Sequence, residues 1–377
     1  MNIVVAPDSF KGSLSAVEAS EVMKDAIMDM FPGYTVNVKP MADGGEGTLD
    51  AILQARKGER VTLTCADALG HRVSTQYGIV EEKTAIIECA EIVGLPQVPD
   101  AKRDPAFATT FGIGEAVIDA LDNGCTEIIV ALGGSATNDG GLGMLKALGM
   151  RAYDADGAEV QGYGADVGKV QRVDVSDMDA RLASVDIRIA SDVDNPLSGE
   201  RGATAVFGPQ KGLSADQVEV YDQAMHAFGT LVEEATSRNV QETPGAGAAG
   251  GLGFALLALG GQIVSGAAFV AEAIRLDEAI READLVLTGE GQSDEQTLYG
   301  KAPGYVATVA KGYGVPAVLV SGSLGGNVDA LLKEFSGCFS IVDRPRSLAE
   351  CMQSAASLLH EQTKQIVSLV STVRVTS

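Results

Sequence analysis

The residues of this chain best suited to chemistry are charged side chains that adjoin glycines. Three of its few basic residues are placed in this way: Lys11, Lys211 and Lys301. A glycine leaves room for an anion to reach backbone N–H groups, and a neighbouring ammonium adds a full positive charge. These lysines are therefore candidates for contacts with phosphate or carboxylate groups.

Acidic residues occupy similar positions. Asp43 lies in the segment Met-Ala-Asp-Gly-Gly-Glu-Gly, Glu290 stands between two glycines, and Asp294 follows four residues later. Carboxylates beside loops that can hold phosphate suggest Mg²⁺, which takes one or two carboxylates together with phosphate oxygens and water. Each acid could equally bond its own backbone or sit at a helix N-terminus, so both interpretations stay open.

A glycine-rich loop at 132–143, with the sequence LGGSATNDGGLG, joins an apolar run to a helix-like stretch. This order of strand, loop and helix is common where proteins bind phosphate. The spacing matches neither a Walker A motif nor a dinucleotide fingerprint, and a tight structural turn is the alternative interpretation. The candidate contacts to anionic oxygens of nucleotide or substrate are Gly133, Gly134, Ser135 and Asn138.

Asp192, Asp194 and Asn195 follow another apolar run, 187–190. Phosphoryl transfer depends mainly on in-line positioning and electrostatic stabilisation, and a carboxylate can take the proton of an acceptor hydroxyl. Ser9 and Ser135 have no His and Asp nearby in the pattern of a hydrolase triad. The constellation therefore favours phosphoryl transfer over hydrolysis through a serine nucleophile.

The elements that must position these residues follow an α/β pattern at both ends of the chain. Short apolar runs at 3–6 and 35–38 each precede a helical pattern, and similar runs recur at 285–287, 317–320 and 338–342. Such runs are typical of buried parallel strands. We predict a five-stranded, doubly wound parallel sheet built from both chain ends, residues 1–62 and 270–377.

The middle of the chain has a different texture. Alternating, hairpin-like segments at 61–65, 73–80 and 85–90 come first, and glycine-rich loops and helical patterns follow. This predicts an inserted second α/β domain with a mixed sheet over residues 63–269.

Composition excludes several classes of function. The 28 basic and 51 acidic residues give a net charge of −23, which argues against binding to nucleic acid or anionic membranes. Five cysteines without C-x-x-C spacing predict reduced thiols in a cytoplasm. The N-terminus lacks the features of a signal peptide. The uncharged stretch 243–271 is interrupted by glycines, and we predict a buried loop and helix there instead of a membrane span.

Seven sequence blocks, in order along the chain, resemble the bacterial glycerate kinases of the first class. They include Ala-Pro-Asp-Ser-Phe-Lys-Gly at residue 6, and the others lie at 41–48, 133–141, 191–197, 207–212, 244–251 and 288–301. The resemblance implies ATP-dependent phosphorylation of D-glycerate at its 2-hydroxyl, giving 2-phosphoglycerate. It also implies a flavodoxin-like domain with an inserted α/β domain, and an active site in the cleft between them.

Within this resemblance the candidate residues take provisional roles. Asp192 is the base, Lys11 and Lys301 are phosphate or carboxylate clamps, and Lys211 joins the residues that bind nucleotide or substrate. Asp43, Glu290 and Asp294 form the Mg²⁺ region. The expected protein is a cytoplasmic monomer or homodimer that uses ATP and Mg²⁺.

The chain departs from the family pattern at Gln292, where the family usually carries Arg, and at Ala68, where Pro is common. The first change removes a charge that Lys301 or Arg201 could replace. Phosphorylation of the 3-hydroxyl, or of another small hydroxy acid, is the alternative within enzymes. A non-catalytic sensor of glycerate or nucleotide is the alternative outside them.

Overall fold

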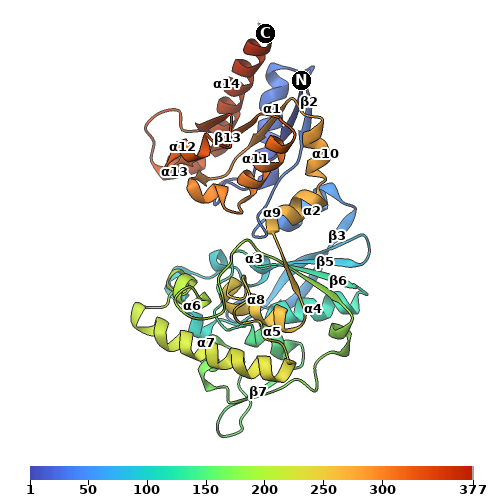
Figure 1. Cartoon of the computed structure of the whole chain (residues 1–377), viewed down its shortest axis with the longest axis vertical. Coiled ribbons are helices and arrows are strands. Elements are labelled where there is room, and N and C mark those ends of the chain that lie inside the picture. Colours follow the sequence, from blue (N-terminus) through green and yellow to red (C-terminus); the bar gives the residue numbers. More distant parts are fainter. Residues whose placement is uncertain (376–377) are drawn as a thin grey trace. The chain divides into compact units, whose positions relative to one another are not determined.

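The computed structural model describes residues 1–375 and divides the chain into two compact units (Figure 1). The first contains Met1–Asp43, Asp50–Arg56 and the chain from Ala267 onward. The second contains Gly44–Leu49 and Lys57–Gly266. The expected boundary at residue 62 falls inside the first strand of the second unit, β3 (Gly58–Ala66).

The first unit is built on a five-stranded sheet whose strands all run parallel. Its strands are β1 (Asn2–Val5), β2 (Thr35–Val38), β11 (Leu285–Thr288), β13 (Ala317–Ser321) and β15 (Gly337–Ser340), in the spatial order β15-β13-β11-β1-β2. Renumbered along the unit this order is 2-1-3-4-5, the flavodoxin-like arrangement. The predicted parallel sheet made from both chain ends is confirmed.

Alternation of side chains along the strands gives this sheet two apolar faces. Ile3 and Val5 point into one core, while Val4 points into the other. Helices α1 (Ala16–Met30) and α14 (Ala355–Val375) cover the first face and lie side by side in Figure 1. The opposite face is covered by α9 (Gly266–Ala273), α10 (Leu276–Arg281) and α11 (Ala302–Gly312), with α2 (Thr48–Ala55) and α12 (Val328–Leu331).

The second unit is built on a six-stranded mixed sheet, as predicted. Besides β3 it contains β4 (Arg72–Val80), β5 (Thr84–Glu88), β6 (Glu127–Ala131), β9 (Asp186–Ala190) and β10 (Gln262–Val264), in the order β10-β9-β6-β5-β4-β3. β3, β4 and β5 pair antiparallel, whereas β5, β6, β9 and β10 run parallel. The parallel strands therefore present their carboxyl ends along one edge of the sheet.

Helices pack around this sheet into a single apolar core. They are α3 (Cys89–Val93), α4 (Phe111–Asp122), α5 (Leu142–Ala147), α7 (Ala215–Thr236) and α8 (Ala248–Ala258), and α6 (Ala203–Phe207) packs against α7 and α8. α8 lies within the uncharged stretch 243–271 and is almost entirely buried, as expected for a helix that is apolar all round. Within residues 1–375, no helix combines the length and apolar character needed to cross a membrane.

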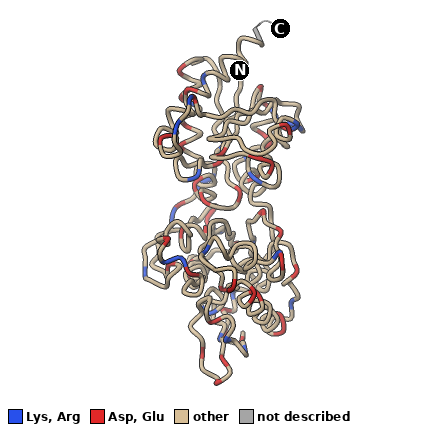
Figure 2. The backbone as a smooth tube through the Cα atoms, turned by 90° about the vertical axis from the view of Figure 1, so that its left-hand side faces the viewer, with Lys and Arg blue, Asp and Glu red and all other residues tan. Residues whose placement is uncertain are grey.

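The remaining elements are short. The hairpin of β7 (Arg151–Tyr153) and β8 (Arg172–Asp174) belongs to the second unit, and the pair β12 (Gln292–Ser293) and β14 (Ser323–Leu324) to the first. α13 (Leu348–Gln353) precedes α14. Figure 2 shows acidic and basic residues interspersed along the backbone of both units, with the acidic residues in excess.

Candidate active site

Acidic side chains gather at the carboxyl ends of the parallel strands of the first unit. Asp8 follows β1, Asp43 follows β2 and Glu290 follows β11. Burial raises the pKa of Asp8 well above its usual range, and the nearby charges of Asp43 and then Glu290 raise it further, while Lys301 opposes the shift. The fold therefore brings three carboxyls and one lysine together from segments almost 300 residues apart in sequence.

Glu290 is held firmly at the centre of this group and is only 7% exposed. Its Oε1 accepts hydrogen bonds from Ser293 Oγ at 3.0 Å and Thr297 Oγ1 at 2.7 Å. Its Oε2 lies 3.2 Å from the ammonium of Lys301, which is the residue before α11. The contact with Lys301 places a partly exposed cation beside the acidic group, where an incoming phosphate could reach it.

Asp294 forms a hydrogen bond to nearby backbone, which is the structural alternative to a metal contact. Its Oδ1 accepts from the backbone N–H of Gln296 at 2.8 Å and so caps the short 3-10 turn Glu295–Leu298. Thr297 links this turn to Glu290, because its hydroxyl donates to Glu290 Oε1 and accepts from the backbone N–H of Asp294. A role for Asp294 near a metal stays a prediction.

Lys11 lies in a tight turn whose ends, Phe10 and Leu14, form a bridge. Its side chain is exposed. A Cβ built on Gly291 would lie 3.2 Å from the backbone nitrogen of Lys11, so this turn packs directly against the loop that carries Glu290. The structure therefore places the loops of Lys11 and Lys301 in the same neighbourhood.

In the second unit, the glycine loop after β6 is packed against a segment from far earlier in the chain. The backbone N–H of Gly133 donates to the carbonyl of Gly44 at 3.1 Å. A Cβ on Gly133 would lie 2.4 Å from the Cα of Gly45, so no larger residue fits without backbone movement. Gly134 has a φ of +78°, in the left-handed region that favours glycine.

We expect Gly133→Ala to destabilise the protein by about 1–3 kcal/mol, because the added methyl group overlaps the backbone of Gly45. Urea unfolding followed by circular dichroism measures the change. Gly33→Ala is the matched control, because a Cβ there would meet no atom within 4 Å. An equal midpoint for the two variants would contradict the close approach.

Lys211 is buried directly behind this loop, with a residue exposure of only 3%. Its ammonium donates to Ser135 Oγ at 3.1 Å and to the carbonyl of Thr137 at 2.6 Å. Desolvation lowers its pKa to about 8, although the charge of Asp139 opposes this effect. Two residues predicted to bind the cofactor, Lys211 and Ser135, are thus brought into contact.

Asn138 is fully buried and only half satisfied. Its Nδ2 donates to Thr204 Oγ1 at 3.0 Å, whereas its Oδ1 has no hydrogen-bond partner. A buried carbonyl oxygen without a donor costs about 1–3 kcal/mol, so this atom is suited to receive a hydroxyl or a water. The atom of Asn138 that has no partner is therefore a hydrogen-bond acceptor. The predicted contact with an anionic oxygen would need a donor instead.

Asp192 follows β9 at the same edge of the sheet. Its Oδ1 accepts from the backbone N–H of Gly266 at 3.0 Å, at the first residue of α9. Asp194, two residues on, forms an exposed ion pair with Arg201 at 2.9 Å. Arg201 is one of the two cations that could replace the charge lost at Gln292, and here it is paired with Asp194.

The sequence model of the glycerate kinase family matches residues 3–371. This chain belongs to the glycerate kinase family. A glycerate kinase from Halalkalibacterium halodurans is 42% identical over 372 residues, which cover 98% of each chain. A glycerate 2-kinase from Escherichia coli is 40% identical over 374 residues, again covering 98% of each.

The fold agrees with that of a solved relative. A structure from Salmonella typhimurium LT2, described as that of a presumed glycerate kinase 2, has a TM-score of 0.86 and 39% identity and covers 99% of both chains. The predicted family, fold class and enzyme class are confirmed. Because the family consists of kinases, membership implies a small-molecule substrate and the use of ATP.

Sequence reasoning missed one buried acid of this glycerate kinase family member. Glu88 ends β5 and is 2% exposed, and its Oε1 accepts from the backbone N–H of Leu49 at 2.5 Å. Burial is the main cause that raises its pKa to about 7. The signal in the sequence was a single carboxylate directly after the apolar run 85–87. In the sheet, Glu88 is in register with Ala131 of β6, which is in register with Ala190 of β9.

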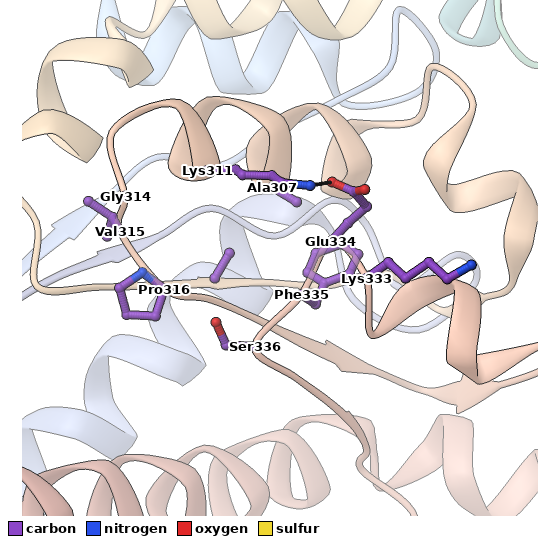
Figure 3. Close-up of a pocket in the computed structure, with 10 residues that line it drawn as sticks. Ala307, Lys311, Gly314, Val315, Pro316, Lys333, Glu334, Phe335 and Ser336 are labelled. Atoms are coloured by element: carbon purple, nitrogen blue, oxygen red, sulfur yellow. Dashed lines mark hydrogen bonds and ion pairs between the residues drawn. The ribbon is translucent and has the colours of Figure 1, made fainter.

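A separate surface pocket of about 360 Å³ lies in the first unit at the amino end of β13 (Figure 3). It is lined by Pro316, Ala317 and Phe335, and also by Lys311 and Glu334, which form an ion pair at 2.8 Å. Ligands of open α/β sheets bind at the carboxyl ends of the strands. The pocket is therefore at the wrong edge of the sheet to be the kinase site.

Proposed function

We propose that this protein transfers the γ-phosphoryl group of ATP to the 2-hydroxyl of D-glycerate, giving 2-phosphoglycerate and ADP. The observation that carries the proposal is the 40% identity, across almost the whole chain, to a relative named glycerate 2-kinase. The residues at the carboxyl ends of both sheets supply the groups that such a transfer needs: lysines for the phosphates, acids for a proton, and glycine loops for close approach.

Asp192 is the proposed base. Its carboxylate would take the proton of the 2-hydroxyl as the hydroxyl oxygen attacks the γ-phosphorus, and the bond from that phosphorus to the β–γ bridging oxygen would break to release ADP. Its Oδ1 accepts from the backbone N–H of Gly266, and this contact orients the carboxyl group. The proposed role is thus that of a held and oriented acid.

Lys11 and Lys301 are the proposed clamps for phosphate or carboxylate oxygens. Both belong to the carboxyl edge of the first sheet, and Lys301 is already oriented by Glu290 at 3.2 Å. In the second unit, Gly133, Gly134, Ser135, Asn138 and Lys211 are the proposed residues for nucleotide or substrate. Lys211 would act largely through Ser135, because its own ammonium is buried.

The acids of the first unit fit a requirement for Mg²⁺. Asp43 and Glu290 are close enough to Asp8 for their negative charges to raise its pKa. A divalent cation would relieve this repulsion. Among residues 1–375, no group of three or more His, Cys, Asp or Glu side chains is arranged to hold a metal by itself. Mg²⁺ commonly binds one or two carboxylates and completes its shell with phosphates and water, and it would neutralise charge on the transferring group. Asp43 and Glu290 are the proposed carboxylates, with Asp294 beside them.

A coupled assay tests the reaction and its position. ATP consumption is measured with D-glycerate and Mg²⁺, and enolase is then added, since it accepts 2-phosphoglycerate and not the 3-phospho isomer. We expect product that enolase consumes. ATP use without such product would move the attack to the 3-hydroxyl, and an absence of ATP use with D-glycerate would favour another hydroxy acid or a non-catalytic sensor.

We also propose a cytoplasmic location, since all five cysteines are free thiols, as expected in a reducing compartment. A monomer or homodimer stays a prediction, which light scattering of the purified protein would test.

A further inference from the structure

Glu88 has an unusual position for a carboxylate. It is the residue before α3, yet its side chain makes no capping contact with that helix. Instead the side chain turns into the interior and reaches the segment Gly44–Leu49, which the chain supplied some 40 residues earlier. A buried carboxylate is expensive unless hydrogen bonds compensate its desolvation, so this placement calls for an explanation.

The compensation comes from backbone donors at the start of α2. Glu88 accepts from the N–H of Leu49 at 2.5 Å, and the nearby N–H of Gly47 also lowers its pKa. The first N–H groups of a helix have no partner inside the helix, and the helix dipole favours a negative charge there. Glu88 therefore holds the N–H of Leu49, and both residues belong to the second unit.

The same segment is seated on the two neighbouring strands by close backbone contacts. The carbonyl of Gly44 accepts from Gly133 after β6, and a Cβ on Gly44 would lie 3.0 Å from the carbonyl oxygen of Ala190 at the end of β9. Thr48 Oγ1 closes the segment on itself by donating to the carbonyl of Gly45 at 2.8 Å. Segment 44–49 thus crosses the carboxyl ends of three parallel strands, and Glu88 is its side-chain anchor.

We propose that Glu88 is a positioning residue that anchors segment 44–49 and thereby fixes the adjoining Asp43. Other acids face the anchor: Glu91 on α3 and Glu46 on the segment itself both disfavour its negative charge. The anchoring stands on the contacts alone, whereas its value for catalysis rests on the proposed function, in which Asp43 belongs to the metal region.

Hydrogen exchange followed by mass spectrometry tests the anchoring without any assay of activity. We expect the amides of Gly47 and Leu49 to exchange at least tenfold faster in Glu88→Ala. Glu88→Gln, which keeps one acceptor oxygen and the volume, should fall between this variant and the wild type, and it carries the test if the alanine variant does not fold. Glu91→Gln is the matched control and should leave these amides unchanged. Unchanged exchange in both Glu88 variants would overturn the proposal.

The role in positioning has its own readout. We expect Glu88→Gln to raise the Mg²⁺ concentration for half-maximal rate about fivefold or more, with the KM for D-glycerate at saturating Mg²⁺ within twofold of wild type. Faster exchange with an unchanged Mg²⁺ requirement would overturn the link to Asp43. Faster exchange in the Glu88 variants, together with a wild type that lacks kinase activity, would contradict the proposed function and leave the anchoring established.

Discussion

Replacing Asp192 by Asn is expected to lower the turnover of D-glycerate phosphorylation by about 10²-fold or more. The amide keeps an acceptor oxygen for the N–H of Gly266, so the start of α9 stays capped, but it no longer takes a proton from the substrate hydroxyl. The enolase-coupled rate at saturating substrates measures the effect. Because the cap survives, loss of rate in a folded variant points to the proton transfer and not to a disturbed helix.

Asp194→Asn is the matched control for this substitution. Asp194 lies two residues away in the same loop, but its side chain is exposed and paired with Arg201. An exposed pair of this kind contributes about 0–1 kcal/mol, so turnover should stay within about twofold of wild type. Near-native turnover in Asp192→Asn would remove this residue as the base.

Replacing Lys301 by Met is expected to lower kcat/KM by about 10²-fold, because a charge aimed at the phosphoryl group is worth roughly as much as one preorganised donor. Met keeps much of the length and packing of the side chain. The substitution also leaves Asp8 and Glu290 without the cation that opposes their charges. The steady-state rate as a function of ATP and D-glycerate separates the loss in kcat from the loss in KM.

Lys311→Met is the matched control, since Lys311 lies in the last turn of α11 whereas Lys301 directly precedes the first residue of that helix. Lys311 is paired with Glu334 in the surface pocket at the amino end of β13. We expect rates within about twofold of wild type. A folded Lys301→Met variant with similarly small losses would show that Lys301 serves only to neutralise Glu290.

The architecture was accessible from sequence because its determinants are local. Apolar runs such as 285–287 mark buried strands wherever they occur, and Ser15 with Glu18 marks the start of α1, where the capping box is present in the structure. Two strands at one end and three at the other leave few ways to form one parallel sheet. The mixed sheet was predicted in the same way, from the hairpin-like segments at 61–65, 73–80 and 85–90.

The site was only partly accessible, because burial and partners depend on how distant segments meet. The sequence showed Lys211 beside a glycine but not that its ammonium is enclosed by Ser135 and Thr137. It showed Asp294 near Glu290 but not that Asp294 caps a turn. Glu88 matches no motif, and its buried contact with segment 44–49 becomes visible only in the fold.

The central position of β1, between β2 and β11, has a consequence for synthesis on the ribosome. β1 and β2 emerge first, but the neighbour on the other side of β1 begins at Leu285. At about 5–20 residues per second, the wait is on the order of tens of seconds. Residues 57–266 can form their own core in the meantime, while the apolar surface of the earliest strands stays uncovered. The nascent chain is therefore most exposed to aggregation at its N-terminal end, and a chaperone that binds there early would act on the first unit alone.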